Sequence, residues 1–242
     1  VSAGVDIVLM PKNITEAHDA IVQAVKEGRL SQQQIDRSVK RVLQLKHAYG
    51  LFDPSPSLQA KLKQAENTVG SEPHFEVERK IAEESVTLLK AENGKLPHPA
   101  TTDRRIAVVA STSAQAQLIE SQLKALGLPK QAGVKTVVQG KASRDEMAQA
   151  TSEADFTIVA SYYSRALQSS YDWAGYQAIM DDLNRRSKPY VLLSLGNPYE
   201  LLHLRNVKNA IAVYGDQESN VTAGLRTILG QMDARGKLPV SL

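Results

Sequence analysis

The chain has 242 residues, of which 42% are hydrophobic and 23% charged, a composition typical of globular proteins. Charges interrupt every apolar run, so no stretch approaches the ~20 apolar residues that cross a bilayer, while interspersed charges (net +3) and only 5% aromatic residues disfavour nucleic-acid binding. The absence of cysteine excludes disulfides, a zinc–thiolate site and a cysteine nucleophile, and no pair of the five histidines has metal-ligand spacing.

The first predicted element is a strand over residues 5–10 (VDIVLM), ended by Pro11. Nearly every position is apolar, which is typical of a strand covered on both faces. Such a strand needs neighbours at both edges, and residues 11–70 contain none. We therefore expect residues 1–52 to be the last βα unit of a larger domain whose earlier part lies outside this chain.

Two helices are predicted after this strand. The first has its N-cap at Asn13 or Thr15, and the second begins at Ser31 and ends at Gly50. The spacing of Ser31 and Gln34 fits a capping box, in which each side chain bonds the backbone N–H of the other residue. Apolar residues three and four apart give both helices one buried face.

The composition then becomes polar and marks a boundary. Residues 53–70 carry two prolines near their start and predict a linker that contains a helical stretch. A helix is predicted from about Glu72 to Ser85, and a short strand follows over residues 86–90. We place the linker at residues 53–79 and a second domain at residues 80–242.

The second domain alternates regularly between two kinds of pattern. Five β-rich runs occupy residues 105–110, 134–139, 155–160, 190–195 and 209–214. Four helical patterns occupy residues 113–126, 143–152, 173–187 and 217–230. This alternation predicts an α/β fold, namely an αβα sandwich with a mostly parallel sheet of five or six strands that is doubly wound or flavodoxin-like.

Two loops follow predicted strands at their carboxyl ends, where parallel sheets often bind ligands. In residues 161–165 (SYYSR), Tyr162 and Tyr163 are candidates to stack on a sugar, and an interdomain contact is an equally good interpretation. Residues 194–201 (SLGNPYEL) favour a tight strand-to-helix turn capped by Asn197 over a ligand site. The single tryptophan opens a predicted helix between two tyrosines, where core packing is commoner than a sugar platform.

Four segments resemble, in one order, glycoside hydrolase family 3, and especially its bacterial two-domain β-N-acetylglucosaminidase branch. They are AGVDIVLMP, AVKEGRLSQQQIDRSVKRVLQLKHAYGLF, AEESVTLLKAENGKLP and GKLPVSL. The resemblance implies that residues 1–52 are the C-terminal end of a TIM-like (β/α)8 barrel and that residues 80–242 are the family's sandwich domain. The linker inferred from composition falls between these two parts.

The resemblance also implies retaining hydrolysis of N-acetylglucosamine-containing glycans derived from the cell wall. The family's nucleophilic Asp and its His–Asp acid/base pair belong to barrel stretches that this chain lacks. No catalytic residue is therefore assigned, and Asp6 is not given that role. Met10 at the barrel rim, Tyr162 and Tyr163 are the candidate substrate-binding residues.

The implied partners are the glycan and an N-terminal barrel domain or chain, without a cofactor, metal, nucleic acid or membrane span. The missing cysteines leave the compartment open, and the resemblance favours a bacterial extracellular or cell-wall location. One alternative is a non-catalytic αβα domain that binds a glycan or braces a subunit. A flavodoxin- or receiver-like module is a weaker alternative, because the first βα turn (VVASTSAQAQ) lacks a Gly-rich loop and an acidic cluster.

Overall fold

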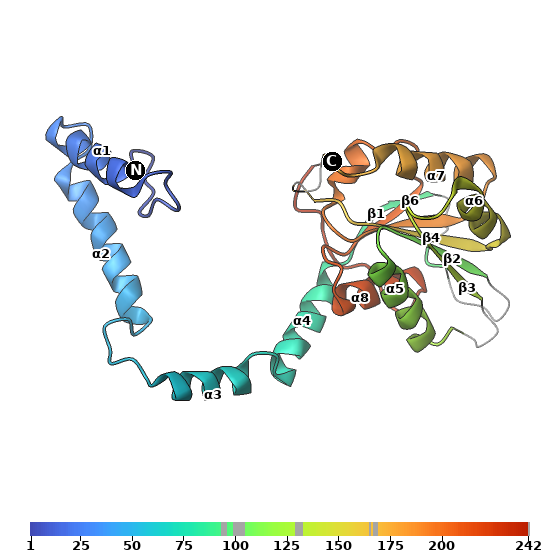
Figure 1. The fold of residues 1–242 in the computed structure, drawn as a ribbon, viewed down its shortest axis with the longest axis horizontal. Coiled ribbons are helices and arrows are strands. Elements are labelled where there is room, and N and C mark those ends of the chain that lie inside the picture. The colour runs from blue at the N-terminus through green and yellow to red at the C-terminus, as the bar shows by residue number, and fades with distance from the viewer. Residues whose placement is uncertain (93–95, 99–104, 129–132, 165, 167–168, 242) are drawn as a thin grey trace. The chain divides into compact units, whose positions relative to one another are not determined.

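The computed structural model describes residues 1–92, 96–98, 105–128, 133–164, 166 and 169–241. The chain divides into two compact units, Val1–Val69 and Gly70–Leu242 (Figure 1). The division falls within the predicted linker, and the domain ranges predicted on either side of it stay predictions. Within the described residues, no helix combines the length and apolar character needed to span a bilayer.

The first unit contains three helices, α1 (Ile14–Lys26), α2 (Gln32–Ala48) and α3 (Leu58–Thr68). The side chain of Asn13, one of the two predicted candidates, caps α1. Ser31 caps α2, since its hydroxyl accepts from the N–H of Gln34 at 3.1 Å. The side chain of Gln34 instead donates to the carbonyl oxygen of Val1 at 3.1 Å, so only one half of the predicted capping box forms.

The predicted strand over residues 5–10 is absent from the structure. These residues are exposed and adopt no regular secondary structure. A strand persists through hydrogen bonds to a neighbouring strand, and residues 1–69 contain no strand to pair with. The segment is held at Asp6, whose carboxylate accepts hydrogen bonds from Ser38 at 2.7 Å and from Arg41 at 3.1 Å.

The first unit has almost no buried core. Ala24 and Leu30 are its only buried hydrophobic residues. Its exposed large apolar side chains are Val5, Ile7, Val8, Leu9, Met10, Ile14, Val22, Val39, Leu43, Leu45, Tyr49, Leu51, Phe52, Leu58, Leu62 and Val69. Burial of apolar surface is the main driving force of folding, so this unit lacks most of the stabilisation that a domain of its length needs.

We expect the two units to behave differently when each is produced alone. Residues 70–242 should unfold in one cooperative urea transition, because their core is extensive. Residues 1–69 should show broad, non-cooperative loss of helical circular dichroism. A sharp transition for residues 1–69 would contradict this prediction.

The second unit is built on one six-stranded sheet. Its strands are β1 (Thr87–Ala91), β2 (Ile106–Ala110), β3 (Val134–Val138), β4 (Phe156–Ser161), β5 (Tyr190–Ser194) and β6 (Asn209–Ala212). The order is β1-β6-β5-β4-β2-β3, in which only β1 is antiparallel to its neighbour. The predicted mostly parallel sheet is confirmed, with six strands.

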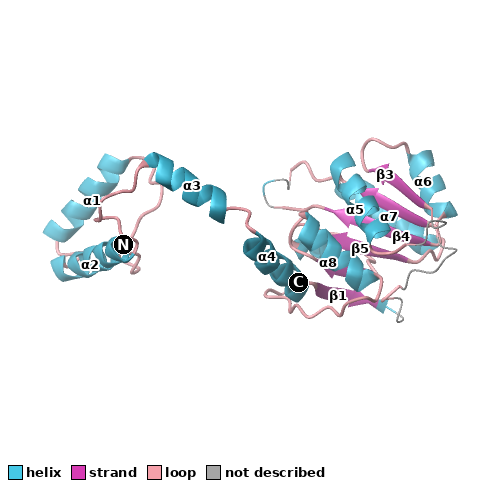
Figure 2. Cartoon of the chain, turned by 90° about the horizontal axis from the view of Figure 1, so that it is seen from below, coloured by secondary structure: helices cyan, strands magenta, loops and turns pink. Residues whose placement is uncertain are grey.

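Helices cover both faces of this sheet (Figures 1 and 2). The first face carries α4 (Glu72–Ser85), α5 (Ser113–Ala125) and α8 (Glu218–Ile228), and the second carries α6 (Arg144–Glu153) and α7 (Trp173–Arg185). Successive strand residues face opposite sides, so Val108 packs in one core and Val109 in the other. The αβα sandwich predicted from the alternating pattern is confirmed.

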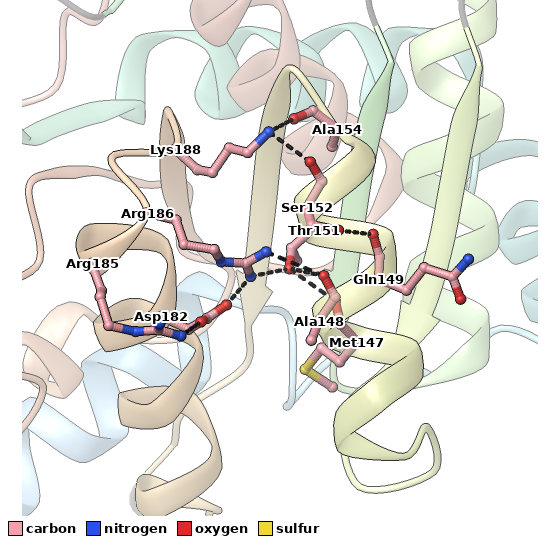
Figure 3. A network of polar contacts seen from close by, with 10 residues as sticks. All are labelled: Met147, Ala148, Gln149, Thr151, Ser152, Ala154, Asp182, Arg185, Arg186 and Lys188. Atoms are coloured by element: carbon pink, nitrogen blue, oxygen red, sulfur yellow. Dashed lines mark hydrogen bonds and ion pairs between the residues drawn. The ribbon is translucent and has the colours of Figure 1, made fainter.

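Two positively charged side chains that follow α7, Arg186 and Lys188, bind the last turns of α6 (Figure 3). Lys188 Nζ donates to the carbonyl oxygen of Ser152 at 2.6 Å. The Arg186 guanidinium donates to Thr151 Oγ1 at 2.9 Å and forms an ion pair with Asp182. Lys188 thereby satisfies a carbonyl that the C-terminus of α6 leaves unpaired, and the two side chains together fix α6 against α7.

Replacing Arg186 with methionine should lower the free energy of unfolding by about 1–2 kcal/mol, because the buried Thr151 hydroxyl and the partly buried Asp182 carboxylate lose a charged donor. Arg185 also pairs with Asp182, but its side chain is 76% exposed against 22% for Arg186. Arg185→Ala is therefore the matched control, with an expected change within about 0.5 kcal/mol. Urea unfolding of both variants measures the difference, and equal losses would contradict the structural role of Arg186.

Candidate functional site

The carboxyl ends of β4 and β5 bring two loops side by side. The strands pair in parallel, with Ser161 opposite Ser194 at their ends. Beyond them, the N–H of Leu195 donates to the Ser161 carbonyl at 2.8 Å, and the N–H of Asn197 donates to the Tyr163 carbonyl at 2.9 Å. The two loops singled out in the sequence therefore form one structure.

A glycine makes this close approach feasible. A Cβ atom on Gly196 would lie 2.0 Å from the carbonyl oxygen of Tyr163. The chain then enters a 3₁₀ turn, η3 (Pro198–Leu202), whose cap is the Asn197 side chain, bonded to the N–H of Tyr199 at 3.3 Å. The turn predicted for this motif is confirmed, and it directs one carboxylate into the protein interior.

That carboxylate belongs to Glu200, which has no exposed surface. Its Oε2 accepts a hydrogen bond from Tyr171 Oη at 2.9 Å and another from Ser161 Oγ, and these two hydroxyls are also in contact with each other. Its Oε1 has no partner among the described residues. Burial raises the pKa of Glu200 to about 7, although the nearby hydroxyls of Ser161, Ser194 and Tyr171 act to lower it.

Other aromatic rings pack around the ring of Tyr171, which supplies one of the two hydroxyls in this network. The Tyr171 ring stacks on Tyr176, with centroids 5.1 Å apart, and touches Tyr163 edge-on at 5.3 Å. The ring centroid of Trp173 lies 4.3 Å from that of Tyr171, and the centroid of His203 lies 4.6 Å from that of Trp173. Burial raises the pKa of Tyr171 well above its ordinary value, so its hydroxyl keeps its proton and can donate.

The structure brings one of the three predicted substrate-binding residues into this cluster. Tyr163 is only 6% exposed and packs against Tyr171 and Trp173. Tyr162 is half-buried and packs against the core on the α5 and α8 side. Met10 is 87% exposed and belongs to the first unit. A substrate-binding role for these three residues stays a prediction.

Sequence reasoning missed Glu200 and Ser161. Each lies in a motif that was recognised, but a lone acid in a predicted turn gives no sign that it is buried. The usable signal was that both motifs follow strands that could be neighbours. Because Glu200 is sealed from solvent, it cannot touch a sugar, and this network can order the loops but not react with a substrate.

A groove of about 660 Å³ lies between α6 and α7 on the second face of the sheet. Met147 and Ile179 contribute apolar lining, and Arg144 contributes a charge. Gln139 and Asp172, which also line it, are joined by a hydrogen bond of 2.6 Å. The volume lies within the range of small-molecule sites. Among the described residues, no cluster of three or more His, Asp or Glu side chains could hold a metal ion.

Comparison with known families and proteins gives two domain matches in one order. Residues 1–45 match the glycosyl hydrolase family 3 N-terminal domain, and residues 86–242 match the glycosyl hydrolase family 3 C-terminal domain. The chain is 26% identical over 256 residues to a β-N-acetylglucosaminidase/β-glucosidase of Cellulomonas fimi, which covers 99% of this chain and 44% of that protein. It is 32% identical over 105 residues to the lysosomal β-glucosidase of Dictyostelium discoideum, which covers 43% of this chain and 12% of that protein.

Solved structures show the same fold. A family 3 β-N-acetylglucosaminidase from Paenibacillus sp. str. FPU-7 matches with a TM-score of 0.60 at 23% identity, over 91% of this chain and 42% of that one. The β-glucoside phosphorylase BglX bound to 2FGlc matches with a TM-score of 0.65 at 23% identity, over 98% of this chain and 43% of that one. The chain thus spans less than half the length of these relatives.

Proposed function

The chain belongs to glycoside hydrolase family 3, and from this premise we propose that it is the C-terminal portion of a retaining β-N-acetylglucosaminidase that acts on cell-wall-derived glycans. The observation that carries the proposal is the likeness over 99% of the chain to the Cellulomonas fimi protein, whose name includes this activity. The same name also includes β-glucosidase, so the sugar preference is the part that most needs a test.

The first unit supports a barrel partner for this chain. Residues 1–45 match the family's N-terminal domain. Many large apolar side chains between Val5 and Phe52 are exposed to solvent. We propose that these side chains pack against the earlier strands and helices of a barrel, supplied by the same polypeptide or by another chain. Residues 5–10 would then become the strand that their composition predicts, because neighbouring strands would satisfy their backbone groups.

The chemistry supports placing both reactive groups in that barrel. Retaining hydrolysis needs a carboxylate nucleophile and a proton donor on either side of the glycosidic bond. Glu200, the acid with the most strongly raised pKa among the described residues, has no exposed surface and cannot serve in either role. Since only residues 1–45 match the family's N-terminal domain, we expect this chain to be inactive by itself, with the sandwich contributing ordered loops to the complete enzyme.

The test compares this chain alone with this chain joined to or mixed with the barrel, on 4-nitrophenyl β-N-acetylglucosaminide and 4-nitrophenyl β-glucoside. We expect no turnover by the chain alone, and a kcat/KM for the complete enzyme at least ~10-fold higher on the N-acetylglucosaminide. Turnover by the chain would refute the placement of the catalytic groups. A preference for the glucoside would refute the proposed sugar specificity alone.

A second candidate function is a glycan-binding or subunit-bracing domain, which the groove between α6 and α7 favours. Trp173 begins α7, directly before the lining residue Ala174. Titration of this chain with N-acetylglucosamine oligosaccharides should then change Trp173 fluorescence in a saturable way. An unchanged emission would leave the domain with a structural role only.

A further inference from the structure

Glu200 joins three segments that are far apart in the sequence. Ser161 ends β4, Tyr171 precedes α7, and Glu200 lies in η3 beyond β5. Oε2 of one carboxylate is the shared acceptor for both hydroxyls, while Oε1 of the same carboxylate is buried without a partner among the described residues. A buried acid that is only half satisfied is not needed for packing, because an apolar or amide side chain of this size would avoid the cost of burying a charge.

We propose that Glu200 is a switch operated by protonation. Its ionised form accepts hydrogen bonds from both Ser161 and Tyr171, and its protonated form releases one of these two donors. An ionised carboxylate is an acceptor only, so both hydroxyls can point at Oε2. A protonated carboxyl carries a hydrogen of its own. Oε1 has no partner among the described residues that could accept this hydrogen, so it is better placed on Oε2, where one of the two hydroxyl oxygens must accept it. One hydroxyl then turns away, and the remaining bonds lose the strength that charge gave them.

The surroundings allow this carboxyl to change charge under ordinary conditions. Burial raises its pKa to about 7, and hydroxyls, not cations, oppose that rise. The titratable groups coupled to it electrostatically are Tyr171 before α7 and Tyr176 within α7. Asp172, the cap of α7, acts on Tyr176, and His203 is the C-cap of η3. Burial raises the pKa of Tyr176 to about 12, so neither tyrosine changes charge in the same range as Glu200.

The chain carries its own reporter of this switch. Trp173 is the only tryptophan, and its ring centroid lies 4.3 Å from that of Tyr171, which bonds Glu200 directly. Movement of Tyr171 should therefore change the tryptophan emission. The His203 ring centroid lies 4.6 Å from that of Trp173, so His203 must be removed as a competing cause of any change in emission.

The experiment records Trp173 fluorescence between pH 5 and 9 in the unaltered chain, in Glu200→Gln and in His203→Gln. We expect a single transition near pH 7 that is retained in His203→Gln and abolished in Glu200→Gln. A transition that survives Glu200→Gln, or that disappears in His203→Gln, would overturn the proposal. This readout needs no substrate, so it does not depend on the proposed hydrolase function.

A second variant tests the proposal independently, in case Glu200→Gln does not fold. Tyr171→Phe removes one donor to the ionised carboxylate but keeps the ring, and loss of that hydrogen bond should move the transition to higher pH by about 0.5 unit or more. Circular dichroism verifies that this variant is folded. A midpoint that stays where it was would overturn the proposal, whatever the outcome with Glu200→Gln.

Discussion

Gly196→Ala is expected to lower the free energy of unfolding of this protein by about 3 kcal/mol or more. The added Cβ would lie 2.0 Å from the Tyr163 carbonyl oxygen and 2.8 Å from its carbon, far inside van der Waals contact. The Tyr163 carbonyl cannot move away cheaply, because it accepts the hydrogen bond from the N–H of Asn197. The two loops must separate, and the hydrogen bonds around Glu200 separate with them.

The matched control is Gly133→Ala, since among the described residues an added Cβ at Gly133 meets nothing closer than Arg105 Cγ at 4.0 Å, and the backbone there needs no positive φ. Its expected effect is within about 0.5 kcal/mol, because alanine also reduces the entropy of the unfolded chain. Urea unfolding followed by circular dichroism measures both variants. Similar stability of the two would show that the loops can part without cost.

The second unit could be predicted well because its signals are local. The β-rich runs and the helical periodicities lie within single elements, and the structure places a strand or helix at each of them. The cap of the first helix was narrowed to Asn13 or Thr15 in the same way, and the structure has Asn13, whose partner is three residues away. Alternation of β and α then leads to a parallel sheet by a general rule of chain connection.

The features that the sequence did not predict correctly share one physical cause: each depends on contacts with residues that are distant in the sequence. Residues 5–10 have the composition of a buried strand, but a strand requires a neighbour, and the first unit provides none. The burial of Glu200 depends on β4 lying beside β5, because only this order places Ser161 and Tyr171 against it. The role of Gly196 depends on the same adjacency, so it was invisible in a motif that could be interpreted as a simple turn.

Glu200→Gln should remove a pH dependence from the stability of the protein. The pKa of Glu200 is about 7 in the folded chain, against an ordinary value of 4.5. Below pH 4.5 the group is protonated in both states and its full stability contribution is present. As pH rises from 4.5 through 7, the unfolded state releases the proton first, so stability falls. At about 1.4 kcal/mol per pH unit, the gap corresponds to roughly 3 kcal/mol lost by pH 8.

A glutamine carries no such proton, so its free energy of unfolding should lack this slope. The difference between Glu200→Gln and the unaltered chain should therefore shift in favour of the variant by up to roughly 3 kcal/mol between pH 4.5 and pH 8, measured by urea unfolding at both values. Glu153→Gln, on the exposed end of α6, is the control that should keep the pH dependence of the unaltered chain. If Glu200→Gln differs from the unaltered chain by the same amount at both pH values, the carboxyl does not change its charge on folding, and its burial in the folded chain must leave its proton affinity unaltered.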